Sequence, residues 1–168
     1  MSAPTPKPTN LKVFPESLPD ELTRLAQWVC WRAVWRDGRW TKVPFQPDGR
    51  PAKSTDPATW REFGECLLAC QSGRFDGIGF VLTRDAGIIG VDLDHCIDAG
   101  GNVAPWAQQA VDTLNSYTEI SPSGDGLHIF VFGTFPGDMT GRRKGGVEVY
   151  AEGRYLTVTG HVPGEVQP

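Results

Sequence analysis

The sequence lacks the features that mark membrane, secreted and strongly basic proteins. It has no signal peptide and no apolar run long enough to span a bilayer, so we expect a protein of the cytoplasm. The formal net charge of −4 excludes a surface that is basic throughout, although a local basic groove is compatible with that sum. No internal repeat is present. With 168 residues, 39% of them hydrophobic, the chain can bury a core.

Cysteine is scarce and lacks the spacing of a metal site. None of the four cysteines stands in a Cys-x-x-Cys pair. A zinc site made from cysteines and histidines is therefore a weaker interpretation than reduced thiols in an intracellular protein. Such a site would draw on Cys30, Cys66, Cys70, Cys96, His95, His128 and His161.

The 20 glycines and 14 prolines predict many short elements joined by turns. Residues 1–12 begin with a proline- and threonine-rich stretch and are predicted to form a disordered leader. Residues 13–165 form the predicted domain, which has at most two sub-lobes, at about 13–84 and 85–165.

Helix signals occur three times in the sequence. One helix is predicted to begin near Pro19, which two acidic residues follow. A second has Asp56 as N-cap, Pro57 as first residue and Gly73 as terminator. The third is predicted over residues 105–116.

The remaining periodic segments are strands, and the first two read as a hairpin. They are 28–35, 40–45, 77–83, 87–94, 117–121, 126–133, 146–150 and 154–160. Because strands outnumber helices and hairpins dominate, we predict an α+β fold with one or two mixed sheets flanked by helices.

The sequence GIIGVDLDHC places two aspartates inside an aliphatic strand. Side chains alternate along a strand, so Ile89, Val91 and Leu93 share one face. Asp92 and Asp94 share the other face, with Cα atoms about 7 Å apart. Neighbouring carboxylates repel each other, and a divalent cation relieves that repulsion. Taken alone, the motif is equally compatible with a solvated strand face.

Two further strands divide their residues in the same way. His128 alternates with aliphatic residues in GLHIFVF, and Glu148 alternates with valines in GVEVY. A single histidine or glutamate on a strand is usually structural. Three strands each have one aliphatic face and one face with a carboxylate or imidazole group, and this coincidence favours a common site.

Two segments add groups suited to anions. The turn before His128 has small residues, amides and hydroxyls that can bind an anion, although ordinary hairpin turns have a similar composition. This turn contains Ser121, Ser123, Gly124, Asp125 and Gly126. The segment PGDMTGRRKGG is predicted to be a mobile basic loop, suited to a polyanion or simply solvated, with Arg142, Arg143 and Lys144.

Carboxylates, an anion-binding turn and a basic loop together indicate nucleotidyl or phosphoryl transfer. In such reactions two metal ions about 3.5–4 Å apart activate the attacking oxygen and stabilise the leaving group. The protein mainly positions the reacting groups and compensates their charge.

The order of the motifs VDLDH, SPSGDGLH and GVEVYAEGRYLTVTG resembles the catalytic domain of the archaeo-eukaryotic primase superfamily. More narrowly, it is similar to the primase-polymerase domain at the N-terminus of phage and plasmid replication proteins. The similarity runs from about Trp28 to Gly160. It implies the primase-polymerase fold, in which a helix-and-strand N-terminal unit packs on an RRM-like mixed sheet.

The resemblance also implies an activity and its partners. These are template-directed synthesis of DNA or RNA from nucleoside triphosphates, a single-stranded DNA template with a primer, and Mg²⁺ or Mn²⁺ in a two-ion site. A helicase domain or protein often accompanies such a domain, in the cytoplasm of a bacterial or archaeal host.

Carried over by position, the resemblance makes Asp92 and Asp94 ligands of the catalytic ions and Glu148 the third carboxylate. Many relatives have aspartate where this chain has Glu148. The resemblance further implies contacts with nucleotide or phosphate from Ser123, Gly124, His128, Lys144, Arg142, Arg143, Lys42 and Arg154.

Other interpretations explain less of the sequence. A haloacid dehalogenase would need threonine or valine where Cys96 stands, and a glycosyltransferase has no use for SGDGLH. A calcium loop lacks its third oxygen ligand and central glycine. The alternative from another class is a non-catalytic nucleotide- or single-stranded-DNA-binding module of a replication initiator.

Overall fold

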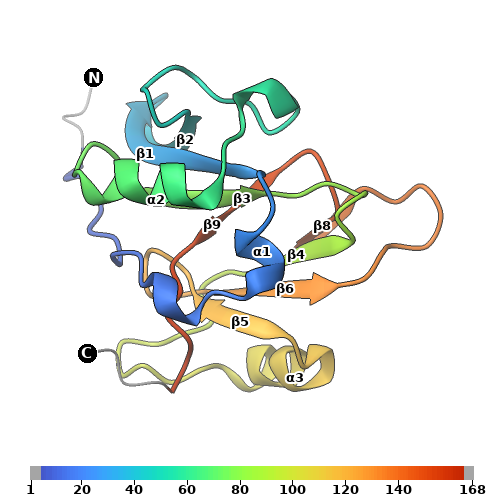
Figure 1. The fold of residues 1–168 in the computed structure, drawn as a ribbon. Coiled ribbons are helices and arrows are strands. Elements are labelled where there is room, and N and C mark those ends of the chain that lie inside the picture. The colour runs from blue at the N-terminus through green and yellow to red at the C-terminus, as the bar shows by residue number, and fades with distance from the viewer. Residues whose placement is uncertain (1–4, 165–168) are drawn as a thin grey trace.

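The computed structural model describes residues 5–164 and contains two antiparallel β-sheets with helices packed on them (Figure 1). Sheet A has the strand order β2-β1-β3-β9, and sheet B has the order β5-β6-β4-β8-β7. The strands are β1 (Trp28–Arg36), β2 (Arg39–Phe45), β3 (Gly77–Val81), β4 (Ile88–Leu93), β5 (Tyr117–Ile120), β6 (Leu127–Phe132), β7 (Gly141–Lys144), β8 (Val147–Tyr150) and β9 (Tyr155–Val158). The helices are the 3-10 helices η1 (Pro15–Ser17) and η2 (Pro57–Thr59) and the α-helices α1 (Asp20–Thr23), α2 (Phe63–Gln71) and α3 (Pro105–Leu114).

The α+β class predicted from the sequence is confirmed, but the expectation of a mixed sheet is wrong. Every pairing between the named strands is antiparallel. Helix α3 connects β4 to β5, and β6 lies between these two strands, so this crossover creates no parallel pair. The primase-polymerase fold implied by the resemblance stays a prediction.

The first two strands of sheet A, β1 and β2, form a hairpin with a tight two-residue turn. Asp37 and Gly38 both have positive φ, at 49° and 77°, as a two-residue type I′ turn requires. Helix α2 covers one face of the sheet (Figure 1). On that side Trp28 packs edge-on against Phe63 at 4.9 Å and Phe80 at 5.4 Å between ring centroids. These aromatic contacts anchor the first core.

The second predicted helix is divided into two elements. Asp56 accepts a hydrogen bond from the Ala58 amide, but it caps only η2. The backbone of Arg61 then exchanges hydrogen bonds of 2.9 and 3.0 Å with Trp28, and this bridge requires an extended chain. Helix α2 therefore starts later, behind a capping box formed by Glu62 and Glu65.

Sheet B carries a second core on the face that α3 covers. Helix α3 contributes Ala107 to the aliphatic side chains of β4 and β6, including Val91, Leu93 and Ile129. On the opposite face of these strands, Ile88 and Phe130 join the first core, and Asp92 and His128 lie on that same face.

The last strand, β9, returns to sheet A, where it pairs with β3. Sheet A thus takes its strands from residues 28–81 and 155–158, and sheet B from residues 88–150, while the sub-lobes 13–84 and 85–165 stay a prediction. The Phe80 and Phe130 rings, 6.3 Å apart, also join the two sheets.

The basic residues of the segment predicted to be a loop, 136–146, lie in an edge strand, so the loop expectation is wrong for them, whereas residues 136–140 contain no helix or strand. Residues Gly141–Lys144 form β7, which pairs with β8. The flanking glycines make a tight two-residue turn with Gly145 at φ +61°, and this turn continues the sheet.

The predicted disordered leader, residues 1–12, lies partly outside the described residues, which exclude 1–4. Residues 5–12 have no helix or strand, but their backbone contacts the domain. The Trp40 indole donates to the Thr5 carbonyl at 2.9 Å, and the Leu11 amide donates to Pro122 at 2.8 Å. None of the helices between residues 5 and 164 is long and apolar enough to cross a membrane.

Candidate active site

Polar side chains from all five strands of sheet B form one row. The register aligns Glu119 with His128, His128 with Asp92, Asp92 with Glu148, and Glu148 with Arg143. Residues directly opposite each other in a sheet share a face, so all five lie on the side away from α3. The three strand faces with polar residues that were inferred from the sequence therefore belong to one face of sheet B.

The carboxylates of this row interact with one another. Asp94 lies just past the end of β4, and its amide donates to Gly146 at 2.8 Å. Partial burial, then the charges of Asp92 and Glu148, raise the pKa of Asp94, while His95 and Arg143 oppose the rise. The Arg143 Nε lies 2.9 Å from Glu148 Oε1.

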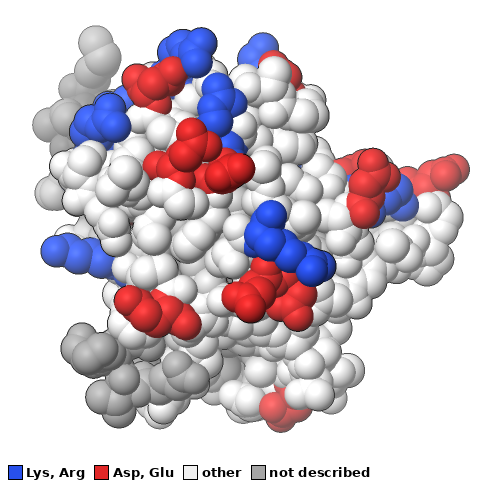
Figure 2. Space-filling model, viewed as in Figure 1, with Lys and Arg blue, Asp and Glu red and all other residues white. Residues whose placement is uncertain are grey.

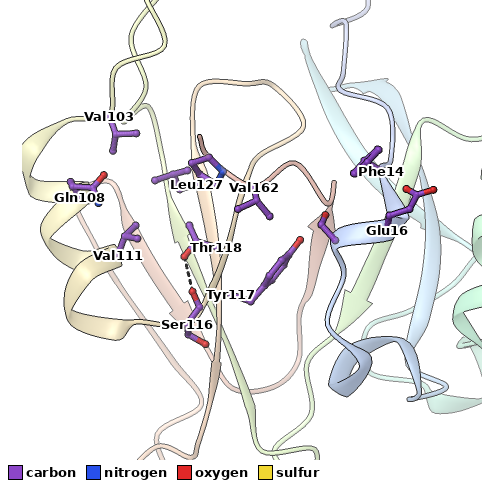
Figure 3. Close-up of a pocket in the computed structure, with 12 residues that line it drawn as sticks. Phe14, Glu16, Val103, Gln108, Val111, Ser116, Tyr117, Thr118, Leu127 and Val162 are labelled. Atoms are coloured by element: carbon purple, nitrogen blue, oxygen red, sulfur yellow. Dashed lines mark hydrogen bonds between the residues drawn. The ribbon is translucent and has the colours of Figure 1, made fainter. Parts of the chain in front are cut away.

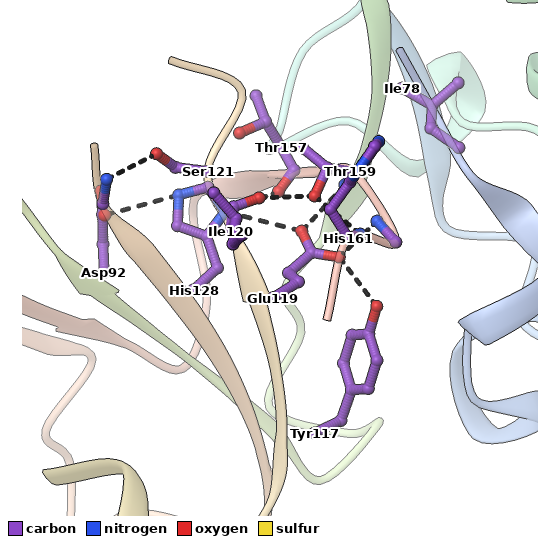
Figure 4. A network of polar contacts seen from close by, with 12 residues as sticks. Ile78, Asp92, Tyr117, Glu119, Ile120, Ser121, His128, Thr157, Thr159 and His161 are labelled. Carbon is purple, nitrogen blue, oxygen red and sulfur yellow. Dashed lines mark hydrogen bonds and ion pairs between the residues drawn. The ribbon is translucent and has the colours of Figure 1, made fainter. Parts of the chain in front are cut away.

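His128 is the most enclosed member of the predicted site, with 4% of its surface exposed. Its Nδ1 lies 2.8 Å from the Thr157 carbonyl, which can only accept, so Nδ1 carries a proton. The opposite nitrogen, Nε2, lies 3.4 Å from Asp92 Oδ1 (Figure 4). Burial alone lowers the pKa of His128, but the attraction of the Asp92 and Glu119 carboxylates outweighs it and raises the value to about 9.

The predicted anion turn lies against the end of β4. A Cβ on Gly126 would come within 2.8 Å of the Leu93 carbonyl, so glycine permits this close approach. The Ser121 hydroxyl accepts a hydrogen bond from the Gly126 amide at 3.1 Å. Ser123 is exposed and donates to the Asp125 carboxylate. Gly124 turns the chain with φ +84°.

His95, named from the sequence only as a possible zinc ligand, lies beside this turn. His95 Nδ1 lies 2.8 Å from Asp125 Oδ2, and that hydrogen bond is the main cause of the raised pKa of His95. The hydrogen bond from Ser123 is the main cause of the lowered pKa of Asp125. The available signal was the position of His95 directly after the second aspartate of VDLDH.

Lys42 reaches the same region from sheet A. Partial desolvation of its ammonium lowers the pKa of Lys42, while the charges of Asp92, Asp125 and Asp94 act in the opposite direction. The Tyr155 hydroxyl donates to the Lys42 carbonyl at 2.7 Å and holds this part of β2. The candidate site is therefore bounded by both sheets.

The three basic residues of β7 do not act as one group. Arg143 belongs to the polar row. Arg142 and Lys144 pair with Val149 and Val147, so their side chains lie on the other face of sheet B. Arg154 stands apart from them, with its guanidinium 4.8 Å from the centroid of the Tyr150 ring.

The face that α1 and α2 cover offers no extended basic surface. Figure 2 shows acidic and basic side chains side by side in small groups there, with neutral residues over most of the area. A cavity of about 730 Å³ lies between α3, β5 and η1 (Figure 3), but its lining includes no residue of the acidic row. The polar row is therefore a better candidate site for phosphate chemistry than this face or this cavity.

The donor set fits a hard divalent cation by its chemistry. Asp92 and Glu148 supply carboxylate oxygens from one face and Asp94 follows at the end of β4; partial burial, then the charges of Asp92 and Glu148, raise the pKa of Asp94. Within residues 5–164, however, no three His, Cys, Asp or Glu side chains are grouped closely enough to hold a metal ion. Glu148 instead pairs with Arg143.

Comparison with known proteins identifies a relative of the phage primase-polymerase class. It is the DNA primase-polymerase of Nitratiruptor phage NrS-1, which is 42% identical over 147 residues. The match includes 84% of this chain and 20% of the relative, so the chain spans about a fifth of the relative's length. No family model matches the chain. The similarity confirms the resemblance to phage-type primase-polymerases inferred from the three motifs.

Proposed function

We propose that this chain is the catalytic domain of a DNA primase or DNA polymerase, a template-directed nucleotidyltransferase of phage or plasmid replication. The observation that carries the proposal is the single row that joins Asp92, His128 and Glu148 across three strands. The similarity to a DNA primase-polymerase supports the same reaction class.

In this proposal Asp92 and Glu148 of the row, together with Asp94, would hold Mg²⁺ or Mn²⁺. Such ions, when bound, activate an attacking oxygen and stabilise the charge of a leaving group. Glu148 would exchange its Arg143 partner for this role, and Arg143 would then be available to an anionic substrate.

The remaining residues would hold the nucleoside triphosphate. The Lys42 ammonium and the Ser123 hydroxyl, which donates to Asp125 in this structure, are donors suited to phosphate oxygens, whereas the Gly124 amide already donates to the Ser121 carbonyl at 2.9 Å. His128 presents only its Nε2 edge, beside Asp92, so a phosphate contact would form there. The 3′-hydroxyl of a primer, or of a first nucleotide, would attack the α-phosphate and release pyrophosphate.

The test is incorporation of labelled nucleotides on single-stranded DNA, with and without a primer, in Mg²⁺ and in Mn²⁺. We expect incorporation by the wild-type chain and none by Asp92→Asn, which keeps the side-chain size. Incorporation by Asp92→Asn at the wild-type rate would contradict the proposed role of the row.

The alternative is a non-catalytic nucleotide- or single-stranded-DNA-binding module of a replication initiator. The Glu148–Arg143 pair favours it, because that pair leaves the third carboxylate engaged. Wild-type protein that binds nucleotide or single-stranded DNA and incorporates nothing under any condition would support this alternative.

A further inference from the structure

A buried carboxylate outside the predicted site ends the polar row on β5. Glu119 has 0% of its surface exposed. Its Oε1 accepts the Thr159 amide at 2.9 Å, and its Oε2 accepts the Gly160 amide at 2.8 Å and the Tyr117 hydroxyl at 2.9 Å (Figure 4). A carboxylate removed from water is costly unless such donors replace the lost hydration. Both oxygens act as acceptors, the pattern of an ionised group.

These hydrogen bonds connect the two sheets at the candidate site. Glu119 belongs to sheet B, whereas Thr159 and Gly160 follow β9, the last strand of sheet A. The same strand carries Thr157, whose carbonyl accepts the proton of His128 Nδ1. Glu119 therefore holds the end of the strand that orients the His128 ring.

Glu119 also acts on the ring directly. Its Oε1 lies 3.8 Å from His128 Nδ1, which is too long for a hydrogen bond but close enough for strong attraction in a buried setting. The attraction favours a ring with Nδ1 toward Glu119 and Thr157. The other nitrogen, Nε2, is then directed at Asp92.

The segment after β9 has little room to move. A Cβ on Gly160 would meet the Phe14 carbonyl at 1.8 Å, and φ at Gly160 is +73°. The Phe14 amide donates to the Thr159 carbonyl at 2.8 Å, and the Ser17 hydroxyl donates to the Gly160 carbonyl. Glu119 and the segment before η1 thus hold residues 159–160 from opposite sides.

We propose that Glu119 is a positioning residue for the proposed nucleotidyl transfer. It fixes the backbone after β9 and so holds His128 against Asp92, although Glu119 itself touches no reacting group. The inference depends on the proposed function, because the row must do chemistry for its alignment to matter. Loss of Glu119 should therefore slow turnover more than it weakens primer-template binding.

The kinetic test uses Glu119→Gln, which keeps the side-chain size but turns an amide group toward a backbone N–H donor. We expect kcat to fall about 10- to 100-fold, the usual effect of removing such a supporting partner. The KM for primer-template should change by less than about twofold. The matched control is Ile129→Val, buried on the opposite face of β6, with kcat close to that of the wild type. Wild-type kcat in folded Glu119→Gln would overturn the proposal.

A second readout does not depend on activity. The chain has three histidines, so His95→Gln and His161→Gln assign the ring ¹⁵N resonances. The His128 Nδ1 resonance should move in Glu119→Gln and stay in place in Ile129→Val. An unmoved resonance would overturn the proposal. If wild-type protein incorporates no nucleotide, the proposed function fails, but this resonance still decides whether Glu119 orients His128.

Tyr117→Phe provides a milder variant should Glu119→Gln not fold. It removes one donor to Glu119 and leaves both backbone hydrogen bonds. We expect a smaller change of kcat and of the His128 resonance in the same direction. If neither changes, Glu119 does not position His128.

Discussion

The charge of His128 should make the stability of this protein depend on pH in a defined direction. Its ordinary pKa is 6.5, and in the folded chain this pKa is raised to about 9, because the attraction of the Asp92 and Glu119 carboxylates outweighs the effect of burial. Since one pKa unit corresponds to about 1.36 kcal/mol, the full stabilisation is about 3 kcal/mol. A raised histidine pKa stabilises the fold fully below pH 6.5. This contribution is lost as the pH rises through about 9.

The measurement compares the wild type with His128→Gln. Urea unfolding would be followed by tryptophan fluorescence from about pH 6 to about pH 10 with a chelator present. In the difference between the two unfolding free energies, the contributions of groups that titrate in both proteins cancel. It should be largest near the acidic limit and shrink by about 3 kcal/mol toward the alkaline limit. Ile129→Val, which changes no titratable group, serves as the control, and its difference from wild type should vary little with pH.

A constant difference across this range would refute the reasoning. It would mean that His128 has the same charge in the folded and unfolded chain, so that Asp92 and Glu119 do not hold a proton on it. A difference that grows with pH would mean that burial dominates and His128 is neutral when folded.

Three further predictions follow from the row and the turn. Asp94→Asn should raise the free energy of unfolding at pH 7, because the pKa of Asp94 is raised in the folded state, and it should abolish nucleotide incorporation. A lower free energy of unfolding in urea would contradict the stability prediction. The binding constant for single-stranded DNA falls with salt concentration, and Arg143→Gln should reduce the slope of its logarithm against that of the salt concentration by about one unit per lost phosphate contact. Arg142→Gln, on the opposite face of β7, should reduce this slope less. Equal slopes for the two variants would contradict a role of the row in binding. Gly126→Ala should cost about 1–3 kcal/mol of stability and weaken triphosphate binding, because the new Cβ would lie 2.8 Å from the Leu93 carbonyl. If calorimetric titration with a nucleoside triphosphate gives the wild-type affinity, the turn does not belong to the triphosphate site.

The strand faces could be predicted from the sequence because alternation is a local property. Val91 and Leu93 on one side of β4, with Asp92 on the other, follow from the period of two alone. The register between strands is not local. Three faces became one row only because β6 and β8 both pair with β4 at Asp92.

The errors arose where tertiary contacts override local signals. Asp56 and Pro57 are good helix-start residues, and they do start a 3-10 helix. The pairing of Arg61 with Trp28 then prevents its continuation. Likewise, glycines around Arg142 and Arg143 are compatible with a loop, but the open edge of β8 converts the segment into a strand.

Glu119 shows why sequence reasoning could not complete the site. In YTEIS it occupies a position that an ordinary edge strand would turn to solvent, so a glutamate there has an unremarkable explanation. Its burial is decided about forty residues later, where the chain leaves β9 and presents the Thr159 and Gly160 amides. Only the return of β9 to sheet A brings those donors next to β5. The group that we infer to align the row is therefore set by the connection between the sheets, which no single strand of the sequence encodes.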